Sequence, residues 1–152
     1  MYTIRMELFF TPLHVFAATL VAFIIGSLWY SPILFLKAYL LGEGLSKEHK
    51  QNLGALYMIQ IQLYSFVAHG AIASVLALLF DIVGVTSLKL AISLGLLVTF
   101  GFVVTSRFVD MLYTPKGKHY EKQAQIKFLV SAGYYLTVVS VMSAVLFLLT
   151  VR

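Results

Sequence analysis

Four apolar runs, each long enough to cross a membrane, constrain this chain more than any other feature of its sequence. A bilayer hydrocarbon core is about 30 Å thick, so a helix needs about 20 apolar residues to cross it. The runs are residues 13–35, 56–80, 90–106 and 128–151, and their only acidic or basic side chains are His14 and His69. The whole chain is 61% hydrophobic and 11% charged, whereas a soluble domain is about one-quarter charged. We therefore predict an all-α integral membrane protein, a four-helix bundle with spans near residues 11–31, 56–80, 88–109 and 127–150.

The residues that could do chemistry are few. The chain has no cysteine, which excludes disulfides, thiolate metal sites and cysteine nucleophiles together. It also has no glycine-rich phosphate loop, no Ser-His-Asp arrangement and no pair of carboxylates inside a span. The expected depths of His14 and His69 in the membrane differ by roughly 10 Å at 1.5 Å of rise per residue, which opposes joint binding of a haem or a metal ion. We expect a single domain over residues 1–152 that is not an enzyme and holds no cofactor and no metal.

Lysine and arginine are distributed unevenly between the loops, and their distribution predicts the topology. Basic residues accumulate in short cytoplasmic loops. The connections after the first and third runs contain eight of the 11 lysines and arginines, and the other three are Arg5, Lys89 and Arg152. We predict a multi-pass protein of the plasma (inner) membrane, with both termini outside and loops one and three in the cytoplasm. The net charge of +5 then reflects topology, and we expect no nucleic-acid partner.

The string GSLWYSP marks the end of the first apolar run. Trp29 and Tyr30 are residue types that anchor helices at the membrane interface. Pro32 lacks the N–H that a helix needs and disfavours helical angles at Ser31, yet Ser31 and Pro32 together also suit the start of a new helix. We predict a short interfacial helix that begins at Pro32 and ends by Gly42. The alternative is one continuous, kinked helix.

Two strings of the sequence carry a family resemblance. The first is Gly-x-x-Trp-Tyr-Ser-Pro, which begins at Gly26 after an alanine-rich span, and the second is SAGYYLTVVSVMSAVL over residues 131–146. Together they resemble the small four-span membrane proteins known as domain of unknown function 1761. This resemblance covers nearly the whole chain and implies a four-helix integral membrane fold without an established activity. Tyr135 stands where the family pattern has the histidine of a Gly-Tyr-His string, which weakens any argument for histidine chemistry in the last span.

Polar side chains occur at two places in or beside the spans. Gln62, Ser65 and His69 are spaced by three and four residues, so they share one face of the second predicted helix. A polar stripe is expensive against lipid, and we expect it to face other helices or water. Arg107 and Asp110, three residues apart at the inner end of the third span, are expected to pair with each other or with lipid headgroups.

Two classes of function fit these features. The first is a non-catalytic homo-oligomeric bundle that binds membrane lipids or a membrane partner through its basic loops and aromatic surface. The alternative is a permeation protein for a small solute, a proton or an ion, in which Gln62, Ser65 and His69 line a polar path. Four short spans would need at least a dimer to enclose such a path.

Overall fold

The computed structural model describes residues 11–45, 55–114 and 117–150, without the side chains of Ala55, Lys118 and His119. All regular secondary structure in this part of the chain is helical, as predicted. Its elements are α1 (Pro12–Trp29), α2 (Leu36–Gly42), α4 (Ala55–Val83), α5 (Leu88–Val98), the π-helix η1 (Thr99–Val104), α6 (Thr105–Leu112) and α7 (Lys118–Thr150).

Four helices are long and apolar enough to cross a membrane. They cover Pro12–Trp29, Leu56–Val83, Leu88–Leu112 and Tyr120–Thr150. The third of them comprises α5, η1 and α6 in one continuous helix, which Ser87 caps by accepting a hydrogen bond from the Leu90 amide at 3.2 Å. The predicted four-span helical fold, with a short helix after the first span, is confirmed. Helix α7 begins before residue 127, where we expected the last span to start, because the polar residues 118–127 continue the same helix.

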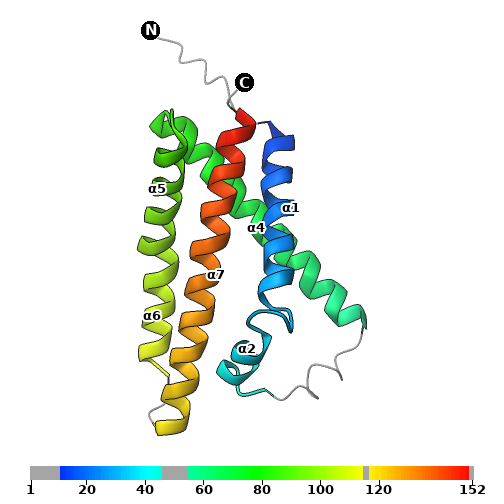
Figure 1. Cartoon of the computed structure of the whole chain (residues 1–152), viewed down its shortest axis with the longest axis vertical. Helices are drawn as coiled ribbons and strands as arrows, with labels where there is room; N and C mark the ends of the chain where they lie inside the picture. Colours follow the sequence, from blue (N-terminus) through cyan, green and yellow to red (C-terminus); the bar gives the residue numbers. More distant parts are fainter. Residues whose placement is uncertain (1–10, 46–54, 115–116, 151–152) are drawn as a thin grey trace.

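Helix α7 is the centre of the bundle. It packs against α1, α2, α5 and α6, while α4 crosses α1 obliquely and contacts α7 less (Figure 1). Lipid provides no hydrophobic drive between helices, so membrane helices associate through small residues that allow close approach. The core is accordingly rich in alanine: Ala18, Ala22, Ala73, Leu76, Ala77, Phe80, Ala91, Tyr134, Val138, Val139, Met142 and Leu146.

The chain breaks at the GSLWYSP string, but the second helix begins later than predicted. Helix α1 ends at Trp29, and α2 begins at Leu36 instead of Pro32. The Ser31 hydroxyl donates to the Leu28 carbonyl at 2.6 Å, and the Ser31 carbonyl accepts from the Leu36 amide at 3.2 Å. Ser31 therefore belongs to a turn that closes α1, and Pro32 lies within that turn. Helix α2 ends at Gly42, as predicted.

Helix α2 and the C-terminal end of α6 lie at the same end of the bundle (Figure 1). These are parts of the two connections in which the sequence concentrates its basic residues. Five of the basic residues behind the topology prediction lie outside the described residues: Arg5, Lys47, Lys50, Lys116 and Arg152.

Candidate functional site

The polar face of α4 meets α7 at His69, which is only 6% exposed. The Nδ1 atom of His69 lies 2.6 Å from the Ser65 carbonyl oxygen, and its Nε2 atom lies 2.6 Å from the Tyr134 hydroxyl. A neutral imidazole that donates from Nδ1 accepts at Nε2, so the Tyr134 hydroxyl is the donor to His69. Both ring nitrogens are therefore satisfied inside the bundle.

The three residues of the polar stripe differ in burial. His69 is buried, Ser65 is half-buried and Gln62 is exposed. All three line a groove of about 510 Å³, which we call the α1–α4 groove; its walls come from α1, α2, α4, α7 and Leu45. Most of its other lining residues are apolar or aromatic, among them Phe23.

Two glycines, one on α1 and one on α7, each leave room for an aromatic side chain of the other helix. A Cβ atom on Gly26 would lie 2.8 Å from the Tyr134 hydroxyl, and one on Gly133 would lie 3.3 Å from the Trp29 ring. Gly26 thus leaves the space in which Tyr134 reaches His69. Trp29, which we predicted as an interfacial anchor, is half-buried against α7. The two strings that carry the family resemblance are therefore in contact with each other.

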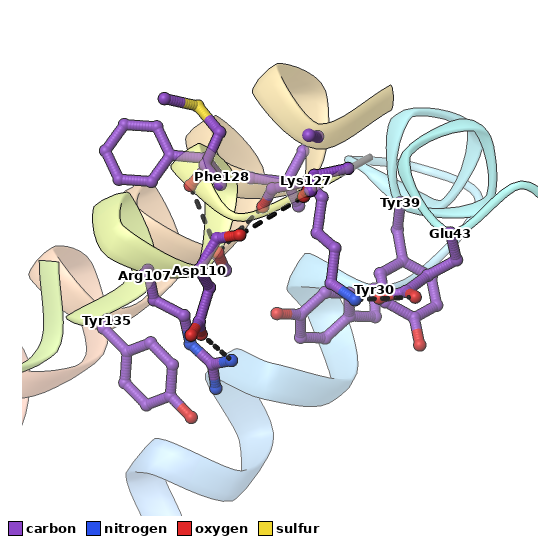
Figure 2. A pocket seen from close by; sticks show the side chains of 13 residues that line it. Tyr30, Tyr39, Glu43, Arg107, Asp110, Lys127, Phe128 and Tyr135 are labelled. Carbon is purple, nitrogen blue, oxygen red and sulfur yellow. Dashed lines mark hydrogen bonds and ion pairs between the residues drawn. The ribbon is translucent and has the colours of Figure 1, made fainter. Parts of the chain in front are cut away.

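A second cavity, of about 440 Å³, lies where the end of α1, α2, α6 and α7 meet, and we call it the charged cavity. Figure 2 shows its two ion pairs, one formed by Arg107 and Asp110 and the other by Lys127 and Glu43. The Nη1 atom of Arg107 is 3.6 Å from the Oδ2 atom of Asp110. The Nζ atom of Lys127 is 2.9 Å from the Oε2 atom of Glu43. The second pair joins α7 to the C-terminal end of α2.

Backbone contact between α2 and α7 positions the Lys127–Glu43 pair. A Cβ atom on Gly42 would lie 2.8 Å from the Lys127 backbone nitrogen, so only glycine allows the two helices this approach. Glu43 is the next residue after Gly42, and its carboxylate reaches the Lys127 ammonium. This pair was not predicted from the sequence, because its members are 84 residues apart. A usable signal was that Glu43 and Lys127 both lie beside apolar segments.

Three tyrosines, Tyr30, Tyr39 and Tyr135, line both cavities. The ring centroids of Tyr30 and Tyr39 are 5.0 Å apart. Burial raises the pKa of Tyr30 to about 12, with smaller upward contributions from Tyr135, Tyr39 and Glu43 and a downward one from Arg107. Burial, followed by the Glu43 carboxylate, also raises the pKa of Tyr39. Tyr30 and Tyr39 are therefore neutral hydrogen-bond donors near pH 7.

The three phenol oxygens have no hydrogen-bond partner in the part of the chain that the structure describes. The Arg107–Asp110 pair sits on the opposite side of Tyr30 from the pair of Lys127 and Glu43 (Figure 2). Within the same described residues, no three His, Asp or Glu side chains converge to hold a metal ion. The site therefore offers charges and neutral donors around a cavity.

Apolar spans with a charged cavity at one end define a multi-pass helical membrane protein. The family model described as protein of unknown function (DUF1761) matches residues 13–147, and the chain belongs to this family. Comparison with curated proteins gives no match, and neither does comparison with solved structures.

Proposed function

We propose that this protein is a non-catalytic membrane protein that binds a membrane lipid, with the lipid headgroup in the charged cavity. The observation that carries this proposal is the pair of cations, Arg107 and Lys127, which come from two different helices and line one cavity beside apolar spans. Guanidinium and ammonium groups are the usual ligands of phosphate in proteins. A cavity of about 440 Å³ is also within the range of about 300–1,000 Å³ typical of small-molecule sites.

The depth of the cavity fits a phospholipid. Lys127 directly precedes the last apolar run, and Arg107 directly follows the third, so both side chains belong at headgroup level. Tyr135 is eight residues beyond Lys127, or about 12 Å deeper along α7 at 1.5 Å per residue. The charged side chains would therefore lie beside the headgroup of a phospholipid, and the aromatic rings would lie deeper, beside its acyl chains.

Removing the two cations tests lipid binding. We expect the Arg107→Gln, Lys127→Gln double variant to lose most of the phospholipid that the wild type retains after purification, as measured by native mass spectrometry from mild detergent. Lys89→Gln is the matched control because Lys89 is an exposed lysine on α5, at the other end of the third span. Equal lipid retention by wild type and double variant would contradict the proposal.

Permeation along Gln62, Ser65 and His69 has weaker support. A proton relay needs a hydrogen-bonded group on each side of the imidazole that can take up a proton and pass it on. The Nδ1 atom of His69 is hydrogen-bonded to the Ser65 backbone carbonyl, which cannot do this, and only its Nε2 atom meets a hydroxyl, that of Tyr134. We assign His69 to packing. Proton or ion flux into liposomes between pH 5 and 8 that disappears in the His69→Leu variant, with the fold retained, would revive the alternative.

The polar residues exposed on α4 favour a homo-oligomer. Gln60 and Gln62 are exposed on a helix that is long enough to span the membrane. Exposed amides in a span are stabilised by hydrogen bonds to another helix. We expect a dimer or larger assembly in detergent, measured by light scattering, and a shift towards monomer in the Gln60→Leu, Gln62→Leu variant.

The basic residues favour a cytoplasmic location for the end of the bundle that holds the charged cavity. Cysteines introduced singly at Lys122 and Lys89 test this orientation, since both lysines are exposed. An impermeant thiol reagent added to intact cells should label the cysteine at position 89 and not that at position 122. The reverse pattern would invert the topology.

A further inference from the structure

Among the described residues that line the charged cavity, positive and negative side chains are equal in number. Arg107 and Lys127 supply two positive charges, Asp110 and Glu43 supply two negative ones, and none of the other described lining residues is acidic or basic. A headgroup with negative charge alone would meet two carboxylates as well as two cations. Electrostatic complementarity therefore favours a ligand that carries charges of both signs.

Both ion pairs leave unused hydrogen-bonding capacity. A guanidinium has five N–H donors, and the 3.6 Å contact between Arg107 and Asp110 is longer than a hydrogen bond. An ammonium has three donors, of which Lys127 directs one at Glu43. The side chains of Arg107 and Lys127 are 43% and 51% exposed. Both cations can therefore bind a phosphate without breaking their ion pairs.

The carboxylates can likewise accept further donors. Asp110 is 69% exposed, and Glu43, at 26%, lies close enough to Tyr39 to raise the pKa of that phenol. A carboxylate accepts about four hydrogen bonds, so both groups can receive an ammonium. The rings of Tyr30 and Tyr39 add aromatic faces that attract a primary and a quaternary ammonium alike, so discrimination between them rests on the carboxylates.

We propose that the charged cavity selects the phosphoethanolamine headgroup, an inference that rests on the lipid binding proposed above. Arg107 and Lys127 bind the phosphate, and Asp110 and Glu43 accept hydrogen bonds from the primary ammonium. Choline carries the same charge but has no N–H, so it cannot satisfy the two carboxylates. Phosphatidylglycerol has no cation for them.

A competition among lipids tests the selection. The purified protein is reconstituted into vesicles of phosphatidylethanolamine, phosphatidylcholine and phosphatidylglycerol in equal parts with identical acyl chains, extracted in mild detergent and examined by native mass spectrometry. We expect the ethanolamine lipid to be retained about tenfold over the choline lipid, as one charge-assisted hydrogen bond would provide. Soluble glycerophosphoethanolamine and inorganic phosphate, each added in excess, show whether a free headgroup or phosphate displaces the lipid.

Neutral substitutions of the carboxylates separate the two halves of the headgroup. In the Glu43→Gln, Asp110→Asn variant the cations are released and the ammonium acceptors are weakened. We expect the preference for ethanolamine over choline to fall to near parity, while retention of the phosphatidylglycerol rises. Glu121→Gln is the control, because Glu121 is an exposed carboxylate in the first turn of α7 that does not line the cavity. If the double variant fails to fold, Asp110→Asn alone carries the test.

The outcomes distinguish this proposal from the one before it. Equal retention of ethanolamine and choline lipids by the wild type, with loss of both in the Arg107→Gln, Lys127→Gln variant, overturns headgroup selection and leaves lipid binding intact. No retained lipid in the wild type overturns both proposals. Displacement of the lipid by inorganic phosphate alone would assign the site to phosphate instead of ethanolamine.

Discussion

The charged cavity and the α1–α4 groove share three tyrosines and differ in how their polar groups are satisfied. In the groove, His69 is buried and both of its ring nitrogens are hydrogen-bonded within the protein. In the charged cavity, four charged side chains form two ion pairs and remain partly exposed. In the sequence, both regions are polar residues next to apolar ones. In the structure, one becomes a fully hydrogen-bonded contact and the other a cavity with partly exposed charges.

This difference is the basis for treating the His69–Tyr134 contact as structural and for proposing the charged cavity as a binding site. A buried polar group is costly unless it is paired, so the His69–Tyr134 contact stabilises one arrangement of α1, α4 and α7. Partly exposed charges with unused donors and acceptors cost little in the free protein, and they can bind a ligand without rearrangement. The comparison predicts that changes in the charged cavity alter lipid binding, and that changes at His69 alter stability.

The largest expected effect comes from separating α2 from α7. The side chain in Gly42→Val would collide with the Lys127 backbone, which cannot move aside as a side chain can. We expect destabilisation of about 1–3 kcal/mol, the usual cost of overpacking, together with loss of lipid retention because Glu43 moves away from Lys127. Thermal unfolding in detergent and native mass spectrometry measure the two effects.

Gly101→Ala is the matched control, because no atom lies within 4 Å of a Cβ at that position. It should leave both unfolding and lipid retention unchanged. If Gly42→Val retains lipid as the wild type does, the charged cavity does not depend on α2 and the comparison fails.

A smaller effect is expected at the His69–Tyr134 contact. His69→Leu leaves the Tyr134 hydroxyl without its partner, and Tyr134→Phe leaves the His69 Nε2 atom without a donor. Each change should lower the free energy of unfolding by about 1 kcal/mol, as typical for hydrogen bonds between membrane helices. A double-mutant cycle in detergent measures their coupling. Lipid selectivity should not change, and a shift in either variant would show that the groove and the charged cavity act together.

The features that could be predicted from the sequence are those determined by residues close together in the chain. The apolar runs indicate the spans because helix length and bilayer thickness are fixed, and Pro32 indicates the break after α1 because it lacks an N–H. The prediction that α2 begins at Pro32 was wrong by about one helical turn. The Ser31 hydroxyl donates backward to the Leu28 carbonyl and also accepts from the Ile33 amide at 3.3 Å, and residues 32–35 form a turn before α2 begins. A serine before a proline can close one helix or cap the next, and the local sequence is the same in both cases.

The contacts that build the two cavities depend on distant residues and could not be predicted. Tyr134 is 65 residues from His69, and Lys127 is 84 residues from Glu43. Helical spacing places Arg107 and Asp110 on one side of α6, where they form an ion pair. The spacing does not indicate which other helix packs against that side. The strings around Gly26 and Gly133 were singled out separately, and only the packing of α1 on α7 brings them together.

The smallest expected effect concerns Tyr30, which lies just beyond the end of α1 and lines both cavities. Burial raises the pKa of Tyr30 from 10.0 to about 12, so in the unfolded chain this phenol ionises at lower pH than in the folded one. The folded state then binds more protons between these values, and the free energy of unfolding must fall as pH rises from about 10 to about 12. The stabilisation is fully present below pH 10. Subtracting the unfolding profile of Tyr30→Phe from that of the wild type isolates the effect, because the variant has no phenol to ionise at this position. A difference that stays constant from pH 9 to 12 would show that Tyr30 is as hydrated as an ordinary surface tyrosine, and its burial between the two cavities would then be wrong.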